Sequence, residues 1–168
     1  MIPKELKEAC GVFGIFAKEP YNISSDVQLG LFALQHRGEE SAGIAVAADG
    51  GVQCYKNMGT VPQVLPDAVL KNIKDSNIAI GHVRYSTAES SDIVNAQPLL
   101  VTGRTGEMAI GHNGNIINSK QIRDKLKQKK ILFQTSIDSE MIAALVNNYY
   151  NGDIARAVNR AAQDLIGS

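Results

Sequence analysis

Cys10 is the residue of this sequence best suited to nucleophilic chemistry. It opens an apolar run, residues 10–17, that predicts a buried strand beginning with a thiol. A small residue, Ala9, precedes it, and residues 1–9 hold too little apolar surface to fold alone. Removing residues 1–9 would leave a thiol and a free α-amino group on one residue, and an amine with a pKa of about 7.7–8.0 is a suitable base near neutral pH. The alternative is that Cys10 is a small buried hydrophobe.

Four further polar clusters lie at strand ends or in loops, where catalytic and binding residues are most often found. They are residues 35–38, 81–87, 111–115 and 135–140. Each has an ordinary structural explanation: a helix cap for Arg37 or Asp138, a surface ion pair for Arg84, and a turn for Asn113 and Gly114. A shared site requires a fold that brings the four clusters to Cys10.

The elements that would position these clusters are mostly antiparallel strands. Residues 42–48 and 52–56 flank an Asp-Gly-Gly turn, which is a strong hairpin signal, and residues 97–101 and 107–111 predict a second hairpin. Residues 11–17 and 78–83 predict two more buried strands. Hairpins without regular βαβ alternation favour an α+β fold, with helices packed on antiparallel sheet.

The predicted helices follow apolar residues at helical spacing. The first is capped by residues 24–26 and ends near residues 35–36, and residues 61–73 predict short pieces interrupted by prolines. Later helices start near Ser119, Asp138 and Asp153. The last of them carries an apolar face made of Ile154, Ala157, Val158, Ala161 and Leu165.

Composition excludes several classes of protein. The formal net charge of +0 gives no basic surface for nucleic acid, and no apolar run reaches the roughly 20 residues that cross a bilayer. Residues 1–9 lack the apolar core of a secretory signal, and the two cysteines favour a reducing cytoplasm. The three histidines are too far apart in sequence to predict a metal site, so we expect them to be buried or loop residues that hydrogen-bond the backbone.

Together with Cys10, the polar clusters resemble the glutaminase domain of amidophosphoribosyltransferase, a class II, N-terminal-nucleophile amidotransferase. The similar segments occur in the same order along the chain: residues 10–14, 35–46, 81–87, 95–98 and 112–115. The forms Gln-His-Arg-Gly at 35–38 and Arg-Tyr-Ser-Thr at 84–87 favour this family over the related glucosamine-6-phosphate synthase.

The resemblance implies a role for eight residues. Cys10 would attack the carboxamide of glutamine, and the side-chain amide of Asn113 and the N–H of Gly114 would stabilise the resulting oxyanion. Glutamine itself would be bound by Arg84 at its α-carboxylate, Asp138 at its α-ammonium and the Gly38 carbonyl at its amine. Arg37 would orient the nucleophile, and the Thr87 hydroxyl would line the pocket.

The resemblance also implies a domain plan. Residues 1–9 would be a propeptide, and residues 10–168 a glutaminase domain, truncated at its C-terminal end, with the layered αββα sandwich of N-terminal-nucleophile hydrolases. Its ammonia would go to a phosphoribosyltransferase domain that converts phosphoribosyl pyrophosphate to phosphoribosylamine in purine synthesis. No cofactor is expected in this chain, whereas Mg²⁺ would serve the transferase half, where some relatives also carry a [4Fe–4S] cluster. A homo-oligomer without membrane or nucleic-acid partners is expected.

Two other functions remain open at the level of the sequence. One is another class II amidotransferase, of the sugar-phosphate or asparagine-forming type. The other is a non-catalytic binding domain with the same fold.

Overall fold

The structure is a computed structural model that describes residues 10–85, 92–103 and 106–167. Within these residues the larger sheet has four antiparallel strands in the order β1-β4-β2-β3. The strands span Gly11–Tyr21 (β1), Ser41–Ala48 (β2), Gly51–Met58 (β3) and Ser76–Arg84 (β4). A smaller antiparallel sheet joins β5 (Leu99–Gly103) to β6 (Gly106–Ile110).

The burial of each strand follows from its place in the larger sheet. β2 lies between β4 and β3, and its residues from Ser41 to Val46 are all buried. A strand covered on both faces is expected to be continuously small or apolar, as this one is. β1 lies at the edge, and its exposed residues Val12 and Phe16 alternate with half-buried Phe13 and Ile15.

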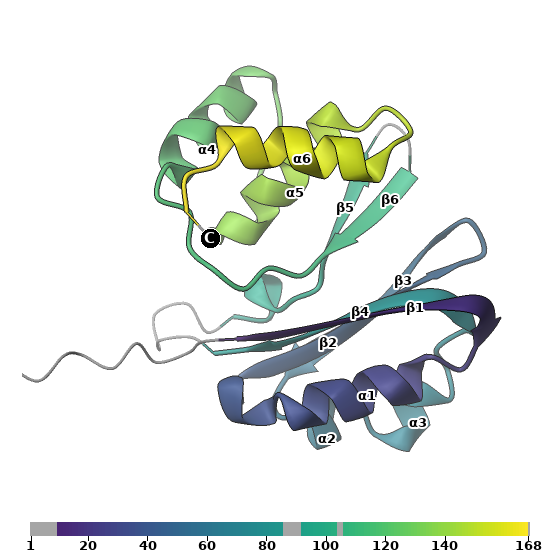
Figure 1. Cartoon of the computed structure of the whole chain (residues 1–168). Coiled ribbons are helices and arrows are strands. Elements are labelled where there is room, and N and C mark those ends of the chain that lie inside the picture. The colour runs from purple at the N-terminus through teal and green to yellow at the C-terminus, as the bar shows by residue number, and fades with distance from the viewer. Residues whose placement is uncertain (1–9, 86–91, 104–105, 168) are drawn as a thin grey trace, which may run out of the picture.

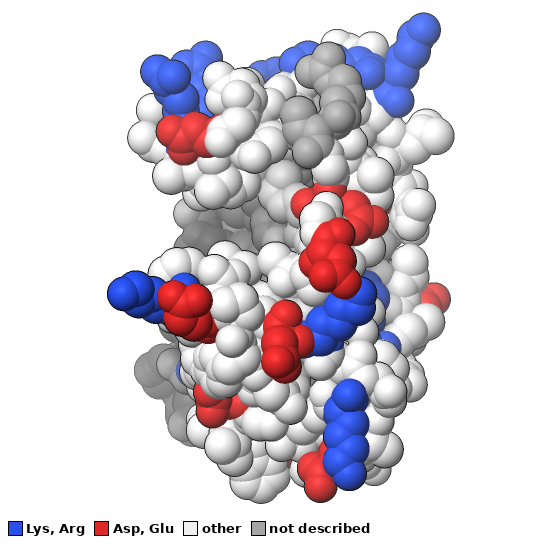
Figure 2. Space-filling view, turned by 90° about the vertical axis from the view of Figure 1, so that its right-hand side faces the viewer, with Lys and Arg blue, Asp and Glu red and all other residues white. Residues whose placement is uncertain are grey.

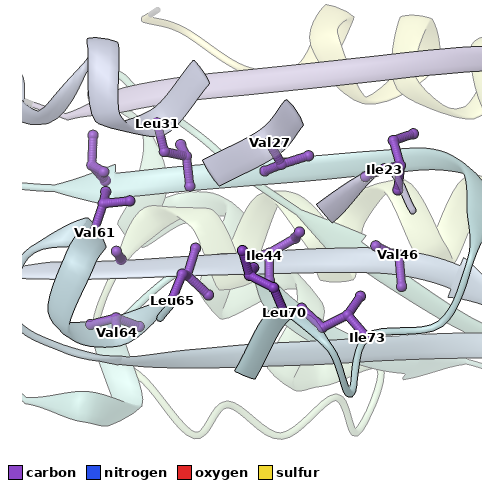
Figure 3. Packing of buried hydrophobic residues seen from close by; sticks show 13 residues of the cluster. Ile23, Val27, Leu31, Ile44, Val46, Val61, Val64, Leu65, Leu70 and Ile73 are labelled. Carbon is purple, nitrogen blue, oxygen red and sulfur yellow. The ribbon is translucent and has the colours of Figure 1, made fainter. Parts of the chain in front are cut away.

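Helices α1 (Ser24–Ala33), α2 (Val61–Val64) and α3 (Asp67–Leu70) cover one face of this sheet (Figure 1). Residues four apart on α1, Val27 and Leu31, are completely buried and belong to the core between these helices and the sheet. Figure 3 shows the side chains of this core, which come from α1, α2, α3 and the central strands. Burial of a Val or Leu side chain stabilises a fold by about 1.5–3 kcal/mol, so this layer fixes the sheet that carries Cys10.

The smaller sheet and three more helices lie on the opposite side of the larger sheet (Figure 1). These helices are α4 (Ser119–Gln128), α5 (Asp138–Tyr149) and α6 (Ile154–Asp164), and they share a second core. The N–H of Val52 on β3 donates to the Glu107 carboxylate on β6 at 2.9 Å, which links the two sheets. The layers therefore run helix, sheet, sheet, helix, which confirms the predicted αββα sandwich and α+β class.

Most elements lie where the sequence predicts them, including both hairpins, the helical pieces in residues 61–70 and the helix that begins at Asp138. The predicted capping of α1 by residues 24–26 is wrong. Its N-cap is Ile23, whose apolar side chain cannot cap it, and the hydroxyl of Ser24 bonds the side chain of Asn22 at 2.5 Å. α1 also ends earlier than predicted, at Ala33, and is followed by a short 3₁₀ turn, η1 (Gln35–Arg37).

The apolar face predicted on the last helix is only partly buried. Ala157 and Ala161 are 1% exposed, whereas Ile154 and Val158 are each 50% exposed. The helix rests on its alanines, so the larger residues beside them lie at the margin of the second core. The predicted helix is confirmed, with Asp153 as its N-cap, and its two alanines rather than Ile154 and Val158 are its buried residues.

The surface has mixed charge on the face shown in Figure 2, where acidic and basic side chains are interspersed. This agrees with the formal net charge of +0. In the part of the chain that the structure describes, every helix is too short or too polar to cross a bilayer.

Candidate active site

Cys10 lies immediately before β1 and is half-buried. Its φ of 69° places it in the left-handed region, which costs about 1–2 kcal/mol for a residue with a Cβ atom. The backbone N–H of Cys10 donates to the carbonyl of Arg37 at 3.1 Å, and Nε of Arg37 donates to the carbonyl of Cys10 at 2.9 Å. The Cys10 thiol points to the carbonyl oxygen of Tyr85, 3.7 Å from Sγ. Backbone strain like that of Cys10, held in place by surrounding contacts, is common at functional sites.

Asn113 reaches Cys10 from a distant part of the chain. Its Nδ2 donates to the carbonyl of Cys10 at 3.4 Å, across 103 residues of sequence. Asn113 and Gly114 follow the end of β6 and are both exposed. The structure thus brings together Cys10, Arg37 and Asn113, three residues that the sequence predicts to act together.

The register of the larger sheet places Gly38 and Arg84 beside Cys10. Gly11 pairs with Val83, so the next residue along β4, Arg84, lies at the end of β1 from which Cys10 extends. Gly38 packs on the backbone of Arg84, where an added Cβ would lie 2.6 Å from the Arg84 carbonyl carbon. No side chain fits that gap, so glycine is required there for the chain after η1 to cross β4.

The side chain of Arg84 is almost completely buried and pairs with a carboxylate. Its Nη1 lies 2.7 Å from Oε1 of Glu40, and the two side chains are 8% and 14% exposed. The carbonyl of Gly38 accepts a hydrogen bond from the Gln35 amide at 2.5 Å. Arg84 and Gly38, both predicted to contact substrate, therefore lie side by side but have protein partners in this structure.

Asp138 is the first residue of α5 and does not cap it. Its Oδ2 accepts a hydrogen bond from the backbone N–H of Ile116 at 3.0 Å. Asp138 is half-buried and is thereby joined to the segment that carries Asn113 and Gly114. Thr87, the remaining predicted site residue, lies outside the described residues, as does the predicted propeptide.

A buried polar network beneath this segment was not predicted from the sequence. His82 on β4 is completely buried, and its Nε2 lies 3.1 Å from the carbonyl oxygen of His112. Gln97, 4% exposed, accepts from the N–H of His112 at 2.8 Å and donates to its carbonyl at 3.4 Å. The prediction that the histidines bond the backbone is confirmed for His82. The motifs around His82 and Gln97 were visible in the sequence, but nothing there shows that both side chains meet His112.

The environment of His82 keeps its imidazole neutral. The pKa of His82 is lowered from 6.5 to about 4, mainly by burial and in smaller part by the nearby Arg84 and His112, against the opposing effect of the hydrogen bond to the His112 backbone. A neutral imidazole carries one N–H, so the bond to the His112 carbonyl assigns the proton to Nε2. Nδ1 is buried and has no partner among the described residues.

The second thiol, Cys54 on β3, has a different environment. Burial raises the pKa of Cys54, and its Sγ donates to the carbonyl of Pro98 at 3.7 Å. A thiol that stays protonated is a poor nucleophile, so Cys54 is expected to be unreactive. Among the described residues there is also no group of three or more His, Cys, Asp or Glu that could hold a metal ion.

The comparisons with known proteins agree with the fold and the site described above. Residues 66–159 match the family described as glutamine amidotransferase domain. The amidophosphoribosyltransferase of Synechocystis is 48% identical over 143 residues, which cover 84% of this chain and 28% of the relative. A solved structure described as the allosteric regulatory enzyme of purine biosynthesis superposes with a TM-score of 0.83 and 33% identity, over 94% of this chain and 33% of that one.

A second solved structure is the glutamine phosphoribosylpyrophosphate amidotransferase of B. subtilis in complex with ADP and GMP. It superposes with a TM-score of 0.77 and 32% identity, over 93% of this chain and 33% of that one. This chain thus spans about a third of the length of the proteins it matches.

An αββα sandwich with a thiol at the head of the edge strand β1 of one inner sheet is the architecture of the N-terminal-nucleophile hydrolases, as the two superpositions bear out. Within that class, the chain belongs to the glutamine amidotransferase domain family. The relatives that it matches over most of its own length are amidophosphoribosyltransferases.

Proposed function

We propose that this chain hydrolyses glutamine to glutamate and ammonia through a thioester on Cys10. The observation that carries the proposal is the double anchoring of the Cys10 carbonyl by Arg37 and Asn113, from 27 and 103 residues away. These contacts hold Cys10 next to the side-chain amide of Asn113, which would stabilise the oxyanion. A structural cysteine needs no such arrangement.

The reaction begins when the Cys10 thiolate attacks the side-chain carboxamide carbon of glutamine. The α-amino group of Cys10 takes the thiol proton and gives it to the leaving amide nitrogen, which departs as ammonia. The Asn113 amide and the Gly114 N–H stabilise the tetrahedral oxyanion, and loss of one such donor typically costs about 2.7–4 kcal/mol of barrier. Water then hydrolyses the γ-glutamyl thioester, releasing glutamate and restoring the thiol.

Substrate binding is assigned to the residues around this nucleophile. Arg84 takes the α-carboxylate, because a guanidinium has five N–H donors and can bind a carboxylate in a bidentate way while Nη1 contacts Glu40. Asp138 takes the α-ammonium, and the Gly38 carbonyl contributes its second lone pair. Thr87, which lies outside the described residues, is assigned to the same pocket by the resemblance alone.

The reaction needs the α-amino group of Cys10 to be free, so residues 1–9 act as a propeptide and the uncut form is an inactive precursor. The Cys10 nitrogen already lies 3.1 Å from the carbonyl of Arg37. After cleavage between Ala9 and Cys10, the same carbonyl would accept a hydrogen bond from the new amine and hold its lone pair near Sγ.

We further propose that the whole protein passes this ammonia to phosphoribosyl pyrophosphate and forms phosphoribosylamine for purine synthesis. The proposal follows from the amidophosphoribosyltransferases that the chain matches. A phosphoribosyltransferase domain of the same protein would use this ammonia, and the protein would act as a cytoplasmic homo-oligomer. Mg²⁺, and a [4Fe–4S] cluster where one exists, would belong to that domain.

This function is tested by assaying the mature whole protein with glutamine and each candidate ammonia acceptor. We expect glutamate release and phosphoribosyl-pyrophosphate-dependent amine formation, both lost in Cys10→Ala. Ammonia transfer to fructose 6-phosphate or to aspartate instead would identify another class II amidotransferase. A wild type with no glutaminase activity, which nonetheless binds partners as well as Cys10→Ala does, would identify a binding domain.

A further inference from the structure

The segment that carries Asn113 and Gly114 is exposed, yet both of its ends are fixed to the interior. At one end the backbone of His112 bonds the buried side chains of His82 and Gln97. At the other end the N–H of Ile116 bonds Asp138 at 3.0 Å. Residues 113–115 thus form a short span between two anchors.

The anchor at His112 joins three separate elements. His82 belongs to β4 of the larger sheet, and Gln97 lies between η3 (Ile93–Asn95) and β5. The His112 imidazole Nδ1 lies 3.3 Å from the Ser139 hydroxyl on α5, next to Asp138. The contact therefore joins β4, the segment before β5 and the helix that carries a predicted substrate ligand.

The peptide unit between His112 and Asn113 is the group that these contacts orient. Its carbonyl oxygen lies 3.1 Å from His82 Nε2 and 3.4 Å from Gln97 Nε2. Two donors from separate elements of the chain on one carbonyl oxygen restrict the rotation of this peptide. The N–H of His112 donates to the Oε1 of Gln97 at 2.8 Å, so the amide of Gln97 contacts both sides of this residue.

This arrangement lowers the stability of the folded protein. His82 is completely buried and its Nδ1 has no partner in the described part of the chain, and an unsatisfied buried polar atom costs about 1–3 kcal/mol. An apolar residue would fill the same space without that cost. Unsatisfied buried groups in native proteins call for a role beyond packing.

We propose that His82 and Gln97 are positioning residues, which orient the His112–Asn113 peptide so that the Asn113 amide and the Gly114 N–H face the oxyanion formed at Cys10. This inference rests on the proposed glutaminase function. Oxyanion donors act by being aligned before the reaction, and a misplacement of about 1 Å can cost 100-fold in rate. Neither side chain needs to touch glutamine.

The test compares three variants in the mature whole protein. His82→Leu and Gln97→Leu keep bulk and remove the donors, and we expect kcat for glutamine hydrolysis to fall about 10- to 100-fold with little change in KM. His82→Gln places an amide N–H near the position of Nε2 and should restore most of the rate. Ser76→Ala, which removes a buried hydroxyl bonded to the Ala47 carbonyl, is the control for general destabilisation and should keep kcat.

Two further readouts separate positioning from other effects. The rate of Cys10 alkylation by iodoacetamide should be unchanged, because that reaction has no oxyanion. In an Asn113→Ala background, His82→Leu should cost much less than in the wild type, since both changes act through the same donor. Equal kcat losses in Ser76→Ala and His82→Leu, or full additivity with Asn113→Ala, would overturn the inference.

Hydrogen exchange tests the positioning separately from the activity. Amides of residues 112–114 should exchange faster in His82→Leu while those of β2 keep their protection. If the wild type shows no glutaminase activity, the proposed function fails, and the exchange result alone then decides whether His82 orders this segment. Unchanged exchange at residues 112–114 would overturn the positioning role.

Discussion

At the scale of single residues, Arg84 gives the most direct test of substrate recognition. A lysine at this position keeps the positive charge beside Glu40 but cannot bind a carboxylate through two parallel N–H groups. We expect Arg84→Lys to raise KM for glutamine about 10-fold or more, with a smaller effect on kcat. Steady-state kinetics of glutamate release measure both constants. Arg160→Lys, on the α6 surface over the ring of Tyr149, is the matched control. An equal KM in both variants would show that Arg84 does not bind glutamine.

His82 makes the stability of the protein depend on pH. Its pKa is about 4 in the folded chain, against an ordinary value of 6.5, so the unfolded chain binds a proton first as the pH falls. The stability contributed by the neutral imidazole is therefore complete above pH 6.5 and is lost progressively down to pH 4, by up to about 3 kcal/mol.

The measurement is denaturant unfolding of wild type and His82→Gln between pH 7.5 and pH 4. Other histidines and carboxylates titrate in both proteins, so the difference between the two curves isolates His82. We expect the wild type to lose more stability than the variant as the pH falls. Parallel curves would mean that His82 is not the group responsible.

At the scale of elements, the crossing of the chain after η1 over β4 depends on Gly38. An added Cβ would lie 2.6 Å from the backbone of Arg84, so Gly38→Ala must push η1 away from β4. We expect a loss of about 1–3 kcal/mol in unfolding free energy and a fall in glutaminase activity, because Arg37 and Arg84 both move. Gly14→Ala on β1 is the control, since nothing lies within 4 Å of its added Cβ. An equally mild effect of both changes would contradict the packing described for Gly38.

Two ion pairs among the described residues, one buried and one exposed, should differ sharply in their contribution to stability. Arg84 and Glu40 are 8% and 14% exposed, whereas Lys74 and Asp49 are 57% and 74% exposed. Removing one charge from a buried pair is costly, so we expect Glu40→Gln to lower the unfolding free energy by about 1–3 kcal/mol. Asp49→Asn should stay within about 0.5 kcal/mol of the wild type. Similar values for the two variants, measured by denaturant unfolding, would contradict the burial of the first pair.

At the scale of the whole molecule, much of the fold could be predicted because its signals are local. The Asp-Gly-Gly hairpin and the uniformly apolar β2 follow from turn chemistry and strand patterning. The start of α1 could not be predicted, because its N-cap is the apolar Ile23 and the Ser24 hydroxyl bonds Asn22. Likewise, nothing in the sequence tells which residues of the apolar face of α6 meet α5 and which stay at the margin.

The candidate site shows the same division between local and long-range information. Residue types and order predict Cys10, Asn113 and Arg37, which the fold brings together. The contacts of His82 and Gln97 with His112 join distant segments, and neither side chain carries chemistry that a motif would reveal. Positioning residues of this kind emerge only from tertiary structure.

The central claim, that Cys10 becomes an N-terminal nucleophile, is tested most directly by the intact mass of the purified whole protein. The mass is measured with and without a glutamine-analogue diazoketone that alkylates such cysteines. The account predicts loss of residues 1–9 and a single adduct that maps to Cys10, with none on Cys54. A protein that hydrolyses glutamine while retaining residues 1–9, or that carries its adduct elsewhere, would contradict it.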